Sequence, residues 1–352
     1  MNKDYQNILI IALRKIGDTI IATSGAYLLR QAYPTAKITM LVRPLTQTVV
    51  ENNPVVDEVM VYNYTHQSSF QEMRGISREI RQKEFDLCIV LDNKPRSAML
   101  AWMAGIPKRV GFEKIEFRNV YLKLFYTDII KIDYDASSTQ QVKNHEIFIN
   151  RFTGRMDTAK MVMSEPMQSG KEKVENLIAK GERPSAKKIA LCVRSGCKTK
   201  DWPLERFAAV IDAVAQARDA TFYVIGSKAD IPYAKELQTM TGVQLNVVCG
   251  ETSLAELAYF IGKMDLFLSV DTGSAHIAAT TDTPLVVLYG STSPDKWGPY
   301  TKNIINIIPQ KECHPCDGKK IHCDEPICLE TIQAEQVTKA CLTQLRGTEG
   351  LK

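Results

Sequence analysis

The chain has 352 residues, too many for one ordinary hydrophobic core, and this length predicts two domains. Its 45% hydrophobic and 24% charged residues are typical of a soluble globular protein. The sequence has no apolar run long enough for a membrane-spanning helix, and its polar start does not resemble a signal peptide. We therefore expect a cytoplasmic protein whose thiols stay reduced.

The formal net charge of +4 arises mainly in the first 150 residues. A solvated surface would explain this excess as well as an anionic partner would. An acidic glycolipid or a membrane surface, met from the cytoplasmic face, would be such a partner. Dense basic runs and alternating basic and aromatic residues are absent from the sequence, so no nucleic acid is expected.

Strand-length apolar runs alternate with segments of helical periodicity along most of the chain. The strands predicted in the first half are 7–13, 37–43, 58–63, 86–92 and 109–112, with helices such as 18–32 and 68–83 between them. The strands predicted in the second half are 187–194, 221–227, 245–250, 266–271 and 284–290, followed by a last helix at 331–346. This alternation predicts parallel sheets covered by helices on both faces.

The stretch from 151 to 188 breaks the alternation. It is rich in Lys, Glu, Ser, Gly and Met, and Pro166 and Pro184 interrupt it. The domains expected from this break are 1–165, 166–330 and a C-terminal segment, 331–352, whose helix packs back on the N-terminal domain. Two doubly wound domains would face each other across a cleft and bind ligands beyond the carboxyl ends of their strands.

The first predicted strand leads into the turn ALRKIGDTIIATSG, residues 12–25. This turn has one early glycine, Gly17, and an acid directly after it, Asp18. The GxGxxG pattern of dinucleotide-binding turns is absent, which argues against an NAD-dependent dehydrogenase. Asp18 is interpreted either as a carboxylate that faces a substrate or as a helix N-cap.

Three loops in the second half also follow predicted strands. In VRSGCKTKDWPLERF, Ser195 and Gly196 form a small polar turn, and Lys200 is placed to neutralise a phosphate unless it is an ordinary surface lysine. In VIGSKADIPYA, Asp230 would accept hydrogen bonds from ribose hydroxyls or cap a helix.

The third loop is SVDTGSAHIAA, in which a strand ends at Asp271 and a helix begins near Gly273. Thr272 or Ser274 would cap this helix, and its first N–H groups would bind a diphosphate. His276 lies in the first turn, where it would add a hydrogen-bond donor or be an ordinary buried histidine.

RKIGD, KDWP, VDTGSAH and PLVVLYGSTSPDKWGP occur in this order. With this set, over essentially its whole length, the chain resembles glycosyltransferase family 9, the ADP-heptose:lipopolysaccharide heptosyltransferases. The resemblance implies the GT-B fold, with an ADP-sugar donor on the C-terminal domain and a lipopolysaccharide-core acceptor on the N-terminal one. It also implies inverting transfer that needs neither metal nor any other cofactor.

The resemblance further implies a role for each matching residue. Asp18 matches the candidate general base, and Asp230 matches an acid that holds the ribose, although the family often has Glu there. The remaining implied donor-binding residues are Ser195, Gly196 and Lys200 for the diphosphate, Thr252 beside the adenine, and Asp271, Thr272, Gly273 and His276 for the diphosphate and sugar. In an inverting transfer the base lies on the face opposite the leaving group, whose charge Lys200 would stabilise.

Other functions remain open at this point. The chain could use another nucleotide sugar, catalyse an epimerisation, or bind a nucleotide sugar without catalysis. Cys313, Cys316, Cys323 and Cys328 lie in a segment that the resemblance does not explain. They would hold zinc, form a disulfide or remain as thiols.

Overall fold

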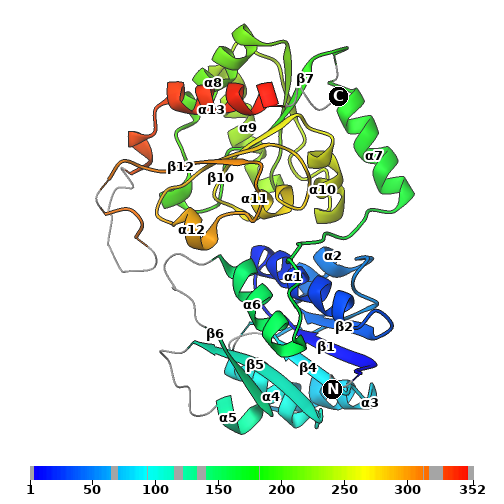
Figure 1. The fold of residues 1–352 in the computed structure, drawn as a ribbon. Coiled ribbons are helices and arrows are strands. Elements are labelled where there is room, and N and C mark those ends of the chain that lie inside the picture. Colours follow the sequence, from blue (N-terminus) through cyan, green and yellow to red (C-terminus); the bar gives the residue numbers. More distant parts are fainter. Residues whose placement is uncertain are drawn as a thin grey trace. The chain divides into compact units, whose positions relative to one another are not determined.

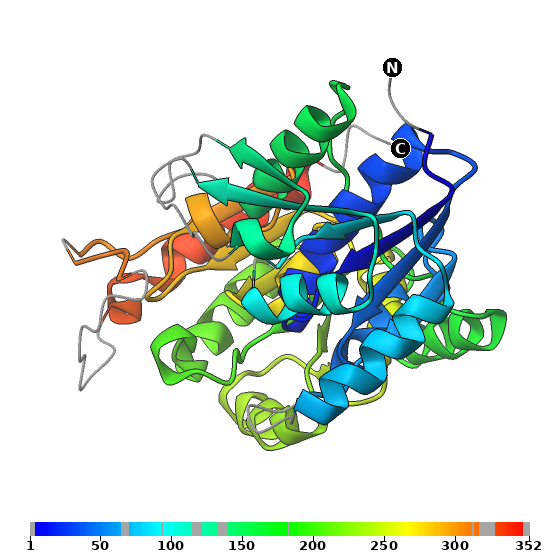
Figure 2. The same cartoon turned by 90° about the horizontal axis from the view of Figure 1, so that it is seen from below.

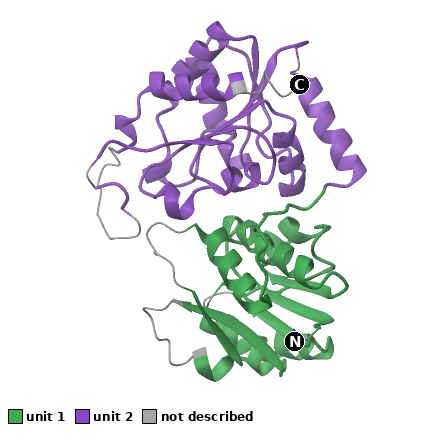
Figure 3. Cartoon of the chain, viewed as in Figure 1, with its two compact units in different colours: residues 1–165 green, residues 166–352 purple. Residues whose placement is uncertain are grey.

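The computed structural model describes residues 4–64, 70–92, 94–114, 122–132, 140–181, 183–311, 313–316 and 328–347. The chain divides into two compact units, residues 1–165 and 166–352, shown in green and purple in Figure 3. Within these described ranges, no helix is long and apolar enough to cross a membrane.

Unit 1 is a parallel sheet of six described strands covered by helices (Figure 1). The strands are β1 (Asn7–Ile11), β2 (Lys37–Val42), β3 (Glu58–Val61), β4 (Leu87–Val90), β5 (Lys108–Lys114) and β6 (Asp128–Ile132). The helices are α1 (Ile16–Ala32), α2 (Gln47–Val50), α3 (Phe70–Gln82), α4 (Pro95–Met103), α5 (Leu122–Phe125) and α6 (Gln141–Thr153).

Both faces of the first sheet are buried. In β1, Leu9 and Ile11 face the core that α3 and α4 complete, while Ile8 and Ile10 alternate to the other face. Helices α1 and α6 pack against each other and can be followed in Figures 1 and 2. This two-sided burial explains why the central strands are continuous apolar runs, as in other parallel sheets.

Unit 2 repeats the same plan. Its strands are β7 (Lys187–Cys192), β8 (Ala220–Val224), β9 (Leu245–Val247), β10 (Leu266–Val270), β11 (Leu285–Leu288) and β12 (Ile304–Ile307). Its helices are α7 (Gln168–Ala179), α8 (Leu204–Ala217), α9 (Ile231–Met240), α10 (Leu254–Gly262), α11 (Gly273–Ala278), α12 (Pro294–Trp297) and α13 (Ala334–Gly347).

The two sheets have the same strand order. The first runs β3-β2-β1-β4-β5-β6 and the second β9-β8-β7-β10-β11-β12, and every pair is parallel. This is the order of the Rossmann fold, in which the direction of strand addition reverses once. The reversal falls between β1 and β4 in unit 1 and between β7 and β10 in unit 2. The predicted α/β class with two doubly wound parallel sheets is confirmed.

The sequence patterns missed two strands. β6 and β12 are the last strands at one edge of their sheets, and most of their residues are half-buried or exposed. An edge strand with one solvated face has a mixed apolar and polar sequence, so it lacks the continuous apolar run of the central strands. The stretch 151–188, predicted as a break, contains the end of α6 and all of α7.

The last helix, α13, lies in unit 2. Val337, Cys341 and Leu345 of α13 are buried in the core of unit 2, where the helix packs against α8 and the sheet. Their spacing of four residues places them on one apolar face of the helix. That face is covered inside unit 2, and packing of the helix on the N-terminal domain stays a prediction.

A buried histidine lies where α1 and α6 meet. The His145 Nδ1 atom is 3.3 Å from the carbonyl oxygen of Ile21 and 3.4 Å from the Ser24 hydroxyl. Burial lowers the pKa of His145 to about 4, and the charges of Asp18 and Arg14 act on it as smaller, opposing influences. The imidazole is therefore neutral in the folded protein at neutral pH.

This histidine should make the fold acid-sensitive. An exposed histidine in the unfolded chain has a pKa of about 6.5. Between pH 6.5 and 4 the unfolded state therefore binds a proton that the folded state does not, and stability falls as the pH falls. The wild-type protein loses free energy of unfolding when the pH falls from 7 to 5. We predict that this loss is about 2 kcal/mol smaller in His145→Gln. Urea titrations of both proteins at the two pH values measure this, and parallel pH dependences would contradict it.

Candidate functional site

In each unit, predicted site residues lie where the strand order reverses, although Asp230 and Thr252 follow strands farther out. Asp18 follows β1, next to β4, in unit 1. In unit 2, the segment 195–201 follows β7, and Asp271 follows β10, its neighbour in the sheet. Doubly wound sheets bind ligands at this point because the connections leave on opposite faces and do not cover the strand ends. Each unit therefore presents one candidate site.

Lys200 and Asp271 are brought together across the reversal in unit 2. The Lys200 ammonium donates to Asp271 Oδ2 at 2.6 Å, and the Thr292 hydroxyl donates to the same oxygen at 2.5 Å. Asp271 is only 6% exposed, whereas Lys200 is half-buried. An ammonium group has three donors, so the contact with Asp271 fixes the lysine and leaves donors for a further anion.

The segment 195–201, which we call the β7 loop, is held from its other side by Asp201. Asp201 Oδ1 accepts hydrogen bonds from both the backbone N–H and the hydroxyl of Ser195, each at 2.7 Å. Gly196 has a φ of +76°, a left-handed conformation that favours glycine. The loop is therefore held in one conformation, with Ser195 and Lys200 near its two ends.

The β7 loop also touches the end of β11. A Cβ atom on Gly290 would lie 2.0 Å from the carbonyl oxygen of Thr199, so the two backbones are in direct contact. The Thr199 and Ser291 hydroxyls are 3.4 Å apart. Together with the Lys200 ion pair, these contacts attach the loop to both β10 and β11.

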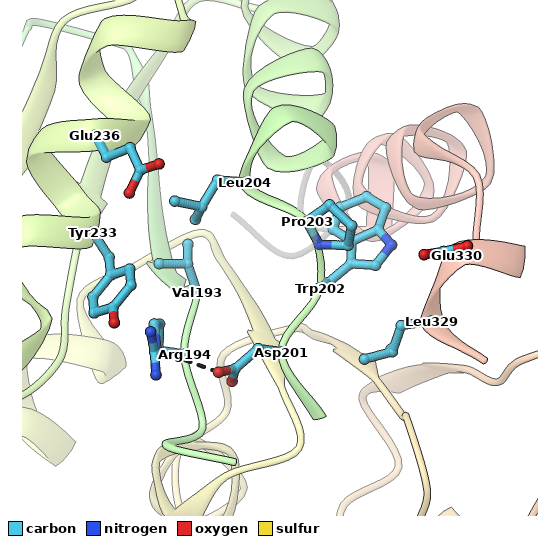
Figure 4. A pocket seen from close by; sticks show the side chains of 10 residues that line it. All are labelled: Val193, Arg194, Asp201, Trp202, Pro203, Leu204, Tyr233, Glu236, Leu329 and Glu330. Carbon is cyan, nitrogen blue, oxygen red and sulfur yellow. Dashed lines mark ion pairs between the residues drawn. The ribbon is translucent and has the colours of Figure 1, made fainter. Parts of the chain in front are cut away.

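Arg194 supports Asp201 from behind. Its guanidinium lies 3.7 Å from the centre of the Tyr233 ring, and its Nε atom is 3.3 Å from Asp201 Oδ2. Figure 4 shows Arg194 between Tyr233 and Asp201, on the wall of a pocket of about 350 Å³. The residues that line this pocket include none of the predicted donor-binding residues. Arg194 and Asp201, which lie in the wall of this pocket, therefore support the β7 loop.

The other predicted donor-binding residues lie at the same edge of the second sheet. Asp230 and Thr252 follow β8 and β9, the next strands beyond β7. Asp230 Oδ2 accepts from the N–H and the hydroxyl of Ser227, at 2.8 and 2.7 Å. Asp230 is thus the third residue of a capping box whose N-cap is Ser227, and as the N-cap of α9 its side chain makes no capping hydrogen bond. The capping box occupies one carboxylate oxygen.

The loop after β10 has the predicted form. Thr272 is the N-cap of α11, although its side chain makes no capping hydrogen bond, and Gly273 begins the helix. His276 is 9% exposed, so the alternative of a buried histidine describes its environment. The structure thus brings Asp271, Thr272, Gly273 and Lys200 to one place, with His276 beneath them in α11.

Asp18 is not a helix cap. Lys15 is the N-cap of α1, and the Asp18 side chain makes an ion pair with Arg14 instead, with Nε and Oδ2 3.1 Å apart. About a quarter of the Asp18 side chain is exposed. The carboxylate is therefore oriented by a neighbour one turn away and accessible to solvent at the strand end.

The sequence analysis missed Asp201, Thr292 and Arg194. Asp201 stands beside Lys200 in the KDWP motif, and an acid beside a lysine expected to meet a phosphate was a signal that could have been used. Thr292 lies 21 positions beyond Asp271 in the sequence, and the pairing of β10 with β11 brings them together. Local sequence patterns do not contain that contact.

The cysteine segment remains a prediction. Cys313 and Cys316 are described, as is Cys328, but Cys323 lies outside the described residues. Across the part of the chain that the structure describes, no group of three His, Cys, Asp or Glu side chains is placed to hold a metal ion.

Comparisons with known proteins identify the family of this chain. The family model described as "Glycosyltransferase family 9 (heptosyltransferase)" matches residues 73–325. Lipopolysaccharide heptosyltransferase 3 of Escherichia coli K12 is 25% identical over 350 residues, which cover 93% of this chain and 95% of the relative.

Solved structures show the same fold. A family 9 glycosyltransferase of Veillonella parvula matches with a TM-score of 0.87 and 26% identity over 99% of both chains. E. coli heptosyltransferase WaaC, solved with ADP, matches with a TM-score of 0.72 and 18% identity over 96% of this chain and 100% of that one. The fold is therefore GT-B, and the chain belongs to glycosyltransferase family 9, the heptosyltransferase family.

Proposed function

We propose that this protein transfers a heptose from ADP-heptose to a sugar of the lipopolysaccharide core, with inversion at the anomeric carbon and without a metal ion. The observation that carries the proposal is the Lys200–Asp271–Thr292 group at the reversal point of the second sheet. A lysine held in place there suits a diphosphate. The names of the relatives support heptose as the sugar and lipopolysaccharide as the acceptor.

In this proposal unit 2 binds the donor. Lys200 pairs with the diphosphate while it keeps its contact with Asp271, and Ser195 and Gly196 bring backbone N–H groups to it. Asp230 and Thr252 hold the ribose and border the adenine, as the family resemblance implies. Thr272, Gly273 and His276 complete the site around the diphosphate and the sugar.

Unit 1 binds the acceptor and supplies the base. The acceptor oxygen attacks the anomeric carbon from the face opposite the diphosphate and passes its proton to Asp18. The new C–O bond forms as the bond from carbon to the diphosphate oxygen breaks, and ADP leaves with the bonding electrons. Lys200 stabilises the negative charge that grows on this leaving group, which is the role a metal ion has in other transferases. We place the reaction at the cytoplasmic face of the inner membrane, where the protein would be peripheral.

The decisive experiment measures ADP release from ADP-heptose by the full chain, with and without a deacylated lipopolysaccharide core oligosaccharide. We expect release that depends on the acceptor, survives EDTA and yields an inverted linkage by NMR. Release without acceptor, an altered sugar still attached to ADP, or binding without turnover would each contradict the proposal. So would immediate inhibition by EDTA that Mg²⁺ reverses, since it would show a catalytic metal.

Asp18→Asn should abolish transfer while ADP affinity stays within a few-fold of wild type. Removing a positioned general base costs roughly 10²–10⁴-fold in rate. Initial rates and calorimetry with ADP measure the two effects, and Glu79→Gln, an exposed acid on α3, is the matched control. More than about a tenth of the wild-type turnover would rule out Asp18 as the base.

Lys200→Ala should weaken ADP binding and slow transfer together, because its charge meets the diphosphate before and during departure. Lys200→Gln removes the charge but keeps a hydrogen-bond donor, since an amide can still donate to the Asp271 carboxylate. We expect both variants to lose ADP affinity by calorimetry, with Lys235→Gln on α9 as the exposed control. Unchanged ADP affinity in Lys200→Gln would place the lysine outside the donor site.

Asp201→Asn should loosen the β7 loop without touching the donor. Hydrogen bonds to a charged acceptor contribute more than neutral ones, so we expect ADP to bind about tenfold more weakly. The turnover at saturating donor should change less than the KM. Glu205→Gln, in the first turn of α8, is the matched control, because Glu205 is a nearby acid whereas Asp201 is the one that binds Ser195. An equal effect of the two substitutions would exclude the positioning role.

A further inference from the structure

A pair of arginines in unit 1 shares one tyrosine ring. The guanidinium carbons of Arg43 and Arg96 lie 5.2 and 4.7 Å from the centre of the Tyr64 ring. Arg43 follows β2, Tyr64 follows β3 and Arg96 is in the first turn of α4, just after β4. Parallel pairing in the order β3-β2-β1-β4 brings these strand ends to one edge, together with the β1 end that carries Asp18.

The ring is fixed to the β1 turn. The Tyr64 hydroxyl donates to the carbonyl oxygen of Leu13 at 3.0 Å, and its ring packs on Tyr62 with the centres 5.4 Å apart. Arg96 Nη1 is 3.4 Å from the Tyr62 hydroxyl. Leu13 precedes Arg14, the ion-pair partner of Asp18, so the arginine pair and the proposed base are built on one connected piece of structure.

Neither arginine has an acidic partner among the residues that the structure describes. Among the described residues, no carboxylate lies within 4.0 Å of Arg43 or Arg96, whereas Arg30 elsewhere in unit 1 pairs with Asp57. Asp92, the acid at the end of β4, directs its carboxylate to other partners. It accepts from the Leu13 N–H, the Lys94 N–H and the Ser97 hydroxyl, and its burial raises its pKa.

Two half-buried guanidinium groups around one ring repel each other, and an anion between them would relieve that repulsion. The planar fork of arginine matches the oxygens of a phosphate or carboxylate, and stacking on tyrosine holds the fork in place. The first 150 residues also carry an excess of positive charge, which would attract an anion. These observations together indicate a ligand that carries a localised oxyanion.

We propose that Arg43 and Arg96, held on Tyr64, form an oxyanion site that reads a phosphate or carboxylate on the acceptor, close to its reacting hydroxyl. The assignment of this ligand as the acceptor rests on the proposed function. The anion would then position the hydroxyl at Asp18, so acceptors without it would bind weakly. A membrane surface is the competing ligand, but it would present many dispersed charges and would not require a stacked pair.

The test uses the full chain and three probes that do not depend on turnover. These are deacylated core oligosaccharide, the same oligosaccharide after phosphatase treatment and carboxyl reduction, and vesicles of phosphatidylcholine with or without phosphatidylglycerol. The variants are Arg43→Gln, Arg96→Gln and the double variant. Arg74→Gln is the matched control, because Arg74 also lies over an aromatic ring, that of Phe70, at 5.3 Å, but on α3.

We expect the double variant to bind the untreated oligosaccharide at least tenfold more weakly and the treated one as wild type does. Each single variant should lose several-fold, and the control should lose nothing. Equal weakening for both oligosaccharides, no weakening, or loss of binding to anionic vesicles alone would overturn the proposal. If the double variant does not fold, judged by its melting curve, the single variants decide by the same comparison.

The test of the oxyanion site can fail or succeed independently of the test of the proposed function. If ADP-heptose is not a donor but the arginine variants still discriminate between the two oligosaccharides, the oxyanion site stands and the reaction must be reassigned. If heptose transfer proceeds and the double variant has an unchanged KM for the untreated oligosaccharide, the oxyanion site is wrong and the reaction stands.

Discussion

The reversal of strand order is the constraint on which the rest of the structure depends. In each sheet, strands are added outward from the first one in one direction and then in the other, so two neighbouring strands send their connections to opposite faces. Their carboxyl ends remain uncovered. The sequence places Asp18 at one such point and the Lys200–Asp271 pair at the other. The polar residues that carry the proposed chemistry therefore need no separate scaffold.

Two carboxylates, Asp271 and Asp201, hold the β7 loop in place. Asp271 holds Lys200 and a hydroxyl on one oxygen, and Asp201 holds the other end of the same loop. Asp271 is nearly inaccessible, so its charge is balanced by the lysine and not by water. In the proposed function the lysine would need little rearrangement to meet the diphosphate, which would lower the cost of ordering the site when the donor binds. In unit 1 the arginines on Tyr64 differ, because the described residues supply the ring but no counter-charge.

Sequence patterns predicted the fold class and the central strands because a strand buried on both faces is a continuous apolar run. They failed for β6 and β12, whose mixed composition reflects an edge position. The amphipathic pattern of the last helix showed that one face is buried, but not which surface covers it. For single residues, too, the sequence predicted local patterns but not tertiary contacts. Lys200 and Asp271 could be found from motifs beside strand ends, whereas the contact of Asp271 with Thr292 depends on the pairing of β10 with β11.

The close approach of Gly290 to Thr199 bears on how this protein can diversify. Most of the proposed donor site is made of side chains on loops, and such positions tolerate exchange as substrate preference changes. The contact between the β7 loop and the end of β11 is different, because any side chain at position 290 would occupy the space of a carbonyl oxygen. The position of the β7 loop thus depends on a contact between two main-chain segments. If the proposed function holds, the sugar and the acceptor could change during evolution while the proposed diphosphate site keeps its place in the unit.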